Sequence, residues 1–236
     1  AMAEMAEEYP DVIFLHCSGY LKNDTNFGNY FGKMYQPRYL SGLAAGAMTE
    51  SNKIGYVAAF PIPEVIRGIN AFATGVKEVN PDATVEVVWT FTWFGPEAET
   101  QAANALLETG VDVLAQHQDS PSTGIAAEAA GAKWISYNTA YGQDAAPGAF
   151  VTAPVWDWGP YYVQVVESIV NDEFVAEAYW GGMETGLVSL YELSSDVPAD
   201  TATLISDRTE EIISGSFDPP IVEDEFIDNV IGTVNP

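Results

Sequence analysis

Apolar and polar positions alternate in blocks along the chain, and the repeat changes between about 2 residues, as in strands, and about 3.6 residues, as in helices. Strand-type blocks cover 12–17, 54–59, 84–91, 111–115, 134–137, 150–153 and 187–193. Helix-type blocks cover 30–48, 63–79, 97–108, 123–130, 158–170 and 199–214, and the Pro- and acid-rich residues 215–236 are expected to lie on the surface. Strands that alternate with helices in this way predict an α/β fold with parallel sheets.

Aromatic and uncharged polar side chains follow the predicted strands at the points where the strands end. In parallel α/β sheets, ligands bind beyond the carboxyl ends of the strands. A pocket built from aromatic faces and a few hydrogen-bonding groups suits a small flat ligand. The candidate ligand-binding residues at these ends are Phe60, Trp93, Phe94, Gln118, Asp119, Ser120, Asn138 and Trp156, with Tyr35 added from the helix at 30–48.

Each of these residues also has a purely structural interpretation. Asp119 is suited to cap the helix at 123–130, because Asp and Ser favour that position. Asn138 is a common turn residue, and Trp156 lies in a segment whose prolines and glycine resemble a hinge. Trp93 and Phe94 could pack in the core, and Tyr35 could pack on a helix face. The sequence leaves these alternatives open.

The charge balance narrows the classes of partner. The chain of 236 residues has 34 acidic and 8 basic side chains, a net charge of −26. Nucleic acids and anionic membrane surfaces attract the opposite charge, so both are disfavoured as partners. The acidic residues are spread along the chain and lysine is scarce. Such a surface suits concentrated salt, where self-repulsion is screened, and predicts a halophilic source.

Signatures of enzymes, metal sites and disulfides are missing from the sequence. It has no G-x-S-x-G, Walker, G-x-G-x-x-G or H-E-x-x-H motif, and the pair His117 and Asp119 lacks a third ligand at convincing spacing. Cys17, the single cysteine, lies in a strand-like run and is expected to be a small buried hydrophobe. We therefore expect no enzyme activity, no catalytic residues, no cofactor and no metal.

Five stretches of the chain resemble the BMP (basic membrane protein) family of substrate-binding proteins for ABC importers, whose cousins are purine-nucleoside-binding lipoproteins. They are YFGKMYQPRYLSGLAAG (30–46), NKIGYVAAFPIPEVIRGINAFATGVKEVNPDA (52–83), VWTFTWFGPEAETQAANALLETGVDVLAQHQDSP (88–121), VTAPVWDWGPYYV (151–163) and YWGGMETGLVSL (179–190). They follow the family order and together span nearly the whole chain, and the second and third are the most specific.

The resemblance implies a type I periplasmic-binding-protein fold, in which two parallel-sheet α/β lobes are joined by crossover strands and close on a ligand. Lobe one would comprise 1–51 plus 153–181, and lobe two 52–152 plus 182–236. Family members have a further strand and helix before the segment that matches YPDVIFLHCSGY. An N-terminal strand and helix are therefore expected to be missing from lobe one.

The resemblance also implies a role and a ligand. It implies an extracytoplasmic receptor that delivers a small molecule to an ABC permease, with membrane contact only through a possible upstream lipid anchor. Nucleoside-binding relatives place an acid where this chain has Asn138 and a lysine where it has Trp156. We expect a purine base such as adenine, or a nucleoside, to be bound. The alternatives are a sugar-binding receptor and a ligand-sensing regulatory protein of the same fold.

Overall fold

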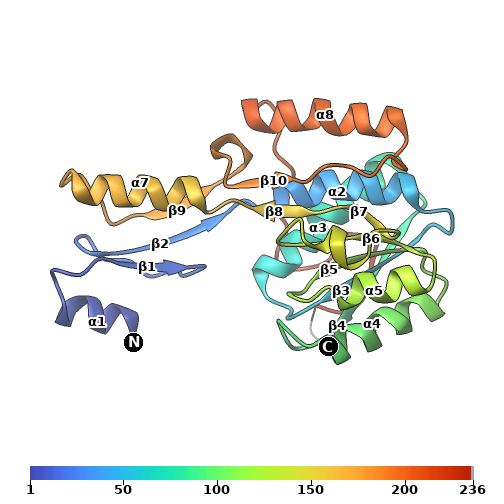
Figure 1. Cartoon of the computed structure of the whole chain (residues 1–236), viewed down its shortest axis with the longest axis horizontal. Coiled ribbons are helices and arrows are strands. Elements are labelled where there is room, and N and C mark those ends of the chain that lie inside the picture. The colour runs from blue at the N-terminus through green and yellow to red at the C-terminus, as the bar shows by residue number, and fades with distance from the viewer. Residues whose placement is uncertain (235–236) are drawn as a thin grey trace. The chain divides into compact units, whose positions relative to one another are not determined.

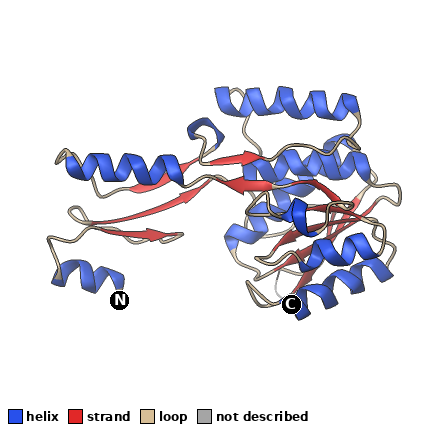
Figure 2. Cartoon of the chain, viewed as in Figure 1, coloured by secondary structure: helices blue, strands red, loops and turns tan. Residues whose placement is uncertain are grey.

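The computed structural model describes residues 1–234 and divides into two compact units. Unit 1 contains Ala1–Lys33 and Asp157–Val188, and unit 2 contains Met34–Trp156 and Ser189–Pro236. The chain passes from one unit to the other three times: after Lys33, at the end of strand β8 (Pro154–Trp156) and inside strand β10 (Val188–Leu190), which pairs with β8. Figure 1 labels the elements, and Figure 2 shows helices and strands alternating along the chain.

Unit 1 is built on a three-stranded parallel sheet in the order β1-β2-β9. Its elements are α1 (Met2–Glu8), β1 (Phe14–Cys17), β2 (Phe27–Gly32), α7 (Gly159–Val170), β9 (Ala178–Gly181) and the 3-10 helix η1 (Met183–Thr185). The ring of Tyr30 on β2 stacks on Tyr161 of α7 at 4.8 Å, and Tyr161 stacks on Tyr179 of β9 at 4.5 Å. These rings join the helix to the sheet.

Two predictions for unit 1 are wrong. The helix predicted over 30–48 begins only at Tyr35, because residues 27–32 form β2 in the middle of the sheet. Gly28 lies so close to the chain of β9 that a Cβ atom there would be 2.7 Å from the carbonyl oxygen of Glu177. Cys17, expected to be buried, is exposed, because β1 is the outer strand of the described sheet.

Unit 2 is built on a six-stranded parallel sheet in the order β11-β4-β3-β5-β6-β7. The strands are β3 (Lys53–Ala58), β4 (Thr84–Trp89), β5 (Val113–His117), β6 (Lys133–Ile135), β7 (Phe150–Thr152) and β11 (Val230–Ile231). The helices are α2 (Tyr35–Met48), α3 (Pro63–Val79), α4 (Pro96–Glu108), α5 (Ser122–Ala129), α6 (Gly142–Ala145) and α8 (Ala199–Ser214). The predicted α/β fold with parallel sheets is confirmed.

Helices cover both faces of the six-stranded sheet. On one face, Leu106 of α4 and Ala127 of α5 join a core cluster with Trp134 of β6. On the other, Tyr56 of β3 packs edge-on against Phe72 of α3 at 5.4 Å. Neighbouring strand residues point to opposite faces, so β3 is buried on both sides and its continuous apolar run is explained.

Helix α2 packs against α3 in unit 2, at very close range. A Cβ atom on Gly42 would lie 2.0 Å from the carbonyl oxygen of Phe72, and one on Gly75 would lie 2.1 Å from that of Tyr39. Glycine at both positions lets the two backbones touch. The unit boundaries therefore differ from the predicted lobes, 1–51 plus 153–181 and 52–152 plus 182–236, which assigned this helix to lobe one.

The segment after α8 is held along α3 and ends in a strand. The Asn70 side chain donates to the carbonyl oxygens of Val222 and Glu225 and accepts from the Ile227 amide, and β11 then pairs with β4. Residues 215–236 were expected to lie on the surface, and at 230–231 they form a short strand at the edge of the sheet in which Ile231 is exposed. The last two residues of this segment lie outside the described part. Within residues 1–234, no helix combines the length and apolar character needed to cross a membrane.

Candidate ligand-binding site

The carboxyl ends of β5 and β6 bring the polar candidates together. β5 is buried along its whole length between β3 and β6, so the sequence after it, Gln118-Asp119-Ser120, emerges at the centre of this edge. β6 ends at Ile135, and Ser136, Tyr137 and Asn138 follow beside it. The parallel register of these neighbouring strands makes their ends adjacent.

A pocket of about 340 Å³ lies at this edge, wholly within unit 2. This volume is within the range of small-molecule sites. Its lining residues are Gln116, Gln118, Asp119, Ser120, Pro121, Trp134, Ser136, Tyr137, Asn138, Thr139, Tyr141 and Gly142. A larger cavity of about 550 Å³ in unit 1 is lined mainly by apolar side chains, including Met2, Met5 and Phe14. Convergent polar groups distinguish the pocket in unit 2.

Asp119, Asn138 and Trp156 form a hydrogen-bonded chain beside the pocket. Asn138 Nδ2 donates to Asp119 Oδ1 at 2.6 Å, and Trp156 Nε1 donates to Asn138 Oδ1 at 3.1 Å. Asn138 has a left-handed backbone with φ of 71°, which Asn tolerates better than most residues. Partial burial raises the pKa of Asp119, while the donation from Asn138 opposes the rise. The indole N–H of Trp156 is thus directed to Asn138.

Gln118 and Ser120 are fixed by other partners. Gln118 Nε2 donates to the Thr90 hydroxyl at 2.5 Å, and the Ser120 hydroxyl donates to Glu99 Oε2 at 2.6 Å. The Ser122 amide at the start of α5 lies 3.3 Å from the Ser120 hydroxyl oxygen, whereas α5 has no side-chain hydrogen bond at its N-cap residue. Helix capping by Asp119, one of the structural interpretations, is therefore not observed.

Two of the aromatic candidates, Phe60 and Trp93, form a rim next to the polar residues. The Phe60 and Trp93 rings are 5.5 Å apart, and Trp93 is 6.0 Å from the His117 ring. The Asp119 amide donates to the Trp93 carbonyl oxygen at 2.9 Å, which joins this rim to the polar group. Phe94 is exposed. None of these three rings is among the residues that line the pocket.

The structure separates Tyr35 from the other candidates. Tyr35 is buried at the start of α2, and its hydroxyl donates to Asp218 Oδ2 at 2.7 Å. Gln36 donates to the other oxygen of the same carboxylate at 2.9 Å. Tyr35 does not line the pocket, and its contacts match the alternative interpretation of helix packing.

A buried cationic group, which the sequence interpretation missed, lies beneath the site. Arg38 of α2 donates from Nη1 to the Gln116 carbonyl oxygen at 2.6 Å, and its guanidinium lies 3.8 Å from the centre of the Tyr137 ring. It thus bridges the ends of β5 and β6. His117 is buried nearby, with Nε2 3.7 Å from Glu64 Oε1. Burial, reinforced by Arg38, lowers the pKa of His117 to about 4 despite Glu64.

Among residues 1–234, no group of three or more His, Cys, Asp or Glu side chains lies close enough to hold a metal ion. What the arrangement offers is an acceptor carboxylate, an amide and neighbouring aromatic faces, which are recognition groups.

Proteins that are already known resemble this chain in fold and in sequence. A solute-binding protein of an ABC transporter from Conexibacter woesei has the same fold, with a TM-score of 0.74 and 24% identity, covering 93% of this chain and 75% of that one. The fold is therefore of the periplasmic-binding-protein type. The chain belongs to the Bmp family, ABC transporter substrate-binding proteins of PnrA-like type, whose model matches residues 1–218.

Two curated relatives differ in the ligand that their names give. A candidate ABC transporter glucose-binding protein of Haloferax volcanii is 45% identical over 92% of this chain. A purine-binding protein of Brucella abortus is 36% identical, also over 92% of this chain. The matches span 55% and 61% of the lengths of these relatives.

Proposed function

We propose that the protein is an extracytoplasmic solute receptor that binds a purine base, such as adenine, or a purine nucleoside and delivers it to an ABC permease. Membership of a substrate-binding family supports the class of activity. We place the binding site at the pocket of about 340 Å³ because the hydrogen-bonded pair of Asp119 and Asn138 lines it. The function is binding, and no bond in the solute is made or broken.

The chemistry of the paired residues supports a base with N–H groups on its edge. Asp119 Oδ1 is already engaged by Asn138, and its second oxygen has no hydrogen-bond partner within residues 1–234. An ionised carboxylate only accepts, so it matches an exocyclic amine or a ring N–H. Phe60, Trp93 and Phe94 are proposed to supply ring faces for the base, and Trp156 donates a hydrogen bond to Asn138. Gln118 and Ser120 are proposed to shape the floor of the site.

A sugar is the second candidate, because the relative from Haloferax volcanii carries a glucose-binding name. Carboxylate and amide groups also bind hydroxyls, so Asp119 and Asn138 alone do not exclude it. A ligand-sensing regulatory protein would use the same pocket, and it would differ in its partner, which would be a regulatory protein in place of a permease.

Calorimetry and thermal shift with adenine, guanine, adenosine and glucose, in concentrated potassium chloride, test the proposal. A ligand that binds only the folded state raises the melting temperature by mass action. We expect adenine or adenosine to do so and glucose to have no effect. Binding of glucose without any purine would assign the site to sugars, and binding of none of the four would overturn the proposed ligand class. Asp119→Ala should weaken the purine response, whereas Asp207→Ala, at an exposed position of α8, should keep it.

A further inference from the structure

Phe91 has an unusual backbone conformation next to the proposed site. It follows β4, and its φ of 56° lies in the left-handed region. A residue with a Cβ pays a steric cost there, which is least for Asn and Asp and marked for bulky side chains. The other non-glycine residues with positive φ within 1–234 are Ser18, Asn52, Asn138 and Asp172. Phe91 is the one aromatic member of this group.

Backbone hydrogen bonds impose this conformation. The Phe91 amide donates to the Ala59 carbonyl oxygen and the Thr90 amide to that of Ala58, both at 2.9 Å. The Thr90 hydroxyl donates to the Thr92 carbonyl oxygen at 3.1 Å. These bonds involve no atom of the phenyl ring, so an asparagine or glycine could hold the same turn with less strain.

The phenyl ring is also poorly covered by the rest of unit 2. Phe91 is 55% exposed, and its ring meets Phe60 edge-on at 6.3 Å. The strained backbone and the exposed phenyl ring are two separate unfavourable features at one residue, and the contact with Phe60 leaves more than half of the residue exposed. Strained residues that the surrounding structure holds in place are concentrated at ligand-binding sites.

The ring continues an aromatic strip that leads to the polar residues. Phe91 contacts Phe60, Phe60 contacts Trp93 at 5.5 Å, and the Trp93 carbonyl oxygen accepts the Asp119 amide at 2.9 Å. The main chain of Trp93 therefore adjoins that of Asp119, and a strip of aromatic rings runs from Trp93 through Phe60 to Phe91. Aromatic surfaces of this kind bind flat or apolar groups.

We infer that Phe91 is a further ligand-contacting residue, whose ring covers a flat or apolar part of the solute and extends the strip of Trp93 and Phe60. This inference rests on the proposed function and deepens it. The bound solute then reaches beyond the group that Asp119 recognises, and contact with the solute offsets the cost of an exposed, strained phenylalanine.

The test compares Phe91→Asn and Phe91→Gly with the unaltered protein, using whichever of adenine and adenosine the unaltered protein binds. Both variants fit the left-handed backbone and remove the ring. We expect Phe91→Asn to raise the melting temperature by about 2–4 °C through relief of strain. It should weaken binding about tenfold through loss of the stacking contact. Phe91→Tyr, which keeps the ring, should retain the affinity.

A matched control is Ile213→Asn, which removes an exposed apolar side chain from α8, outside the strip, and should leave the affinity unchanged. Unaltered affinity in both Phe91→Asn and Phe91→Gly would overturn the inference and leave the proposed function standing. Failure of the unaltered protein to bind any purine would overturn the proposed function, and the inference with it. The two failures are therefore distinguishable in one series of titrations.

Discussion

Asn138 Nδ2 lies 2.6 Å from Asp119 Oδ1, so the turn after β6 donates a hydrogen bond to the turn after β5. The residues are 19 positions apart in the chain, and they meet because their strands are neighbours in the sheet. The bond engages one carboxylate oxygen, and it comes from a residue whose backbone is left-handed. In the proposed receptor, this pair orients an acceptor toward the solute before the solute arrives.

Replacing Asp119 by alanine should separate binding from stability. We expect the affinity for adenine or adenosine to fall about 10- to 100-fold, the range for loss of a hydrogen bond to a charged group. The melting temperature should change little, because Asp119 is only partly buried and Asn138 can be hydrated. Calorimetry measures the affinity and thermal unfolding measures the melting temperature, with Asp207→Ala as the control variant for both. An unchanged affinity would show that Asp119 does not contact the solute.

The sequence pattern predicted the elements whose local signals are strong. Helix α3 matches its predicted bounds, because Pro63 favours the first helical position and the apolar face repeats regularly. The pattern failed at β2, where aromatic residues between Gly28 and Gly32 resemble the start of an apolar helix. Only pairing with β1 and β9, which is not a local property, reveals β2 as a strand.

The meeting of the polar candidates could be predicted from the sequence, whereas their contacts could not. Polar residues after β5 and β6 were expected to lie together, because parallel strands share their carboxyl ends, and a pocket lies at that sheet edge. Arg38 was missed, since an arginine in a helix is ordinarily a surface residue, and nothing in the sequence shows that this one is buried over Tyr137. Tyr35 was included although its partner, Asp218, lies far along the chain.

His117 should make the folded state sensitive to acid. Its pKa is about 4 in the folded protein, against an ordinary value of 6.5, because burial disfavours the charged form. The unfolded chain therefore takes up this proton first as the pH falls, and stability is lost between these two values. The loss should be on the order of 2–4 kcal/mol. Urea unfolding across this range, compared with His117→Gln, isolates the effect. If the unaltered protein and His117→Gln lose stability equally as the pH falls, His117 is not the cause of the loss.

Two glycine-to-alanine changes in packed helices should have opposite effects. A Cβ on Gly68 of α3 would meet nothing closer than His117 Nδ1 at 3.6 Å, an ordinary contact. Gly68→Ala should therefore stabilise the protein by about 0.5–1 kcal/mol, because alanine costs less backbone entropy in a helix. Gly42→Ala should destabilise by about 1–3 kcal/mol, because its Cβ would collide with the Phe72 carbonyl oxygen at 2.0 Å. Urea unfolding measures the change in unfolding free energy of each variant. Changes of the same sign in the two variants would refute the packing argument.

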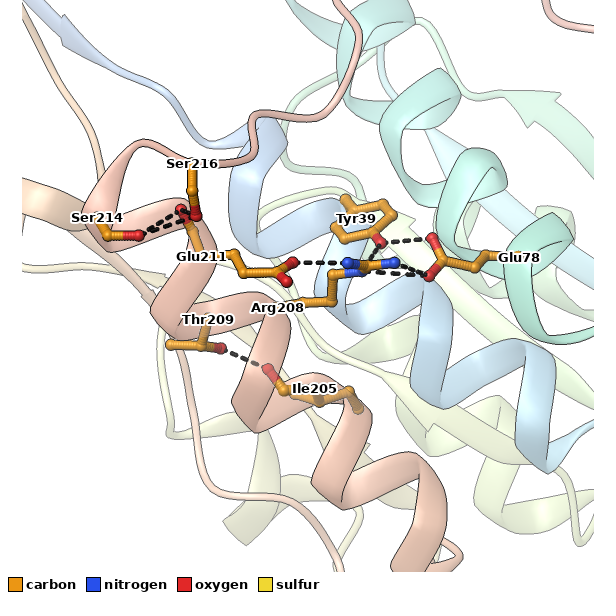
Figure 3. Close-up of polar contacts among 8 residues, drawn as sticks. All are labelled: Tyr39, Glu78, Ile205, Arg208, Thr209, Glu211, Ser214 and Ser216. Carbon is orange, nitrogen blue, oxygen red and sulfur yellow. Dashed lines mark hydrogen bonds and ion pairs between the residues drawn. The ribbon is translucent and has the colours of Figure 1, made fainter.

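The Tyr39 hydroxyl should contribute to the docking of α8. It donates to Glu78 Oε2 at 2.5 Å and accepts from Arg208 Nε at 3.1 Å, which ties α2, α3 and α8 together (Figure 3). Tyr39→Phe keeps the buried ring and should cost about 1 kcal/mol of unfolding free energy. Lys77→Met, which breaks the exposed pair with Asp228, should cost close to nothing. If the two variants are equally stable, the hydroxyl contributes no more than an exposed ion pair.

Salt should stabilise the protein because repulsion outweighs its ion pairs. With 34 acidic and 8 basic side chains, most carboxylates lack a cationic partner. Raising potassium chloride from about 0.1 M to about 2 M shortens the screening length from about 10 Å to below about 3 Å, which weakens repulsion between separated carboxylates. The melting temperature should therefore rise by several degrees, although exposed pairs such as Lys77–Asp228 weaken at the same time.

The origin of this salt effect can be tested by reducing the charge. Lysine at the exposed positions Asp82, Glu108 and Glu210 in one triple variant changes the net charge from −26 to −20, since each substitution adds two units. If repulsion is the cause, this variant should be more stable than the unaltered protein at low salt and should gain less from added salt. Sucrose, which stabilises by exclusion without screening charge, should raise both melting temperatures equally. A salt response identical in the two proteins would show that general exclusion, and not charge repulsion, is responsible.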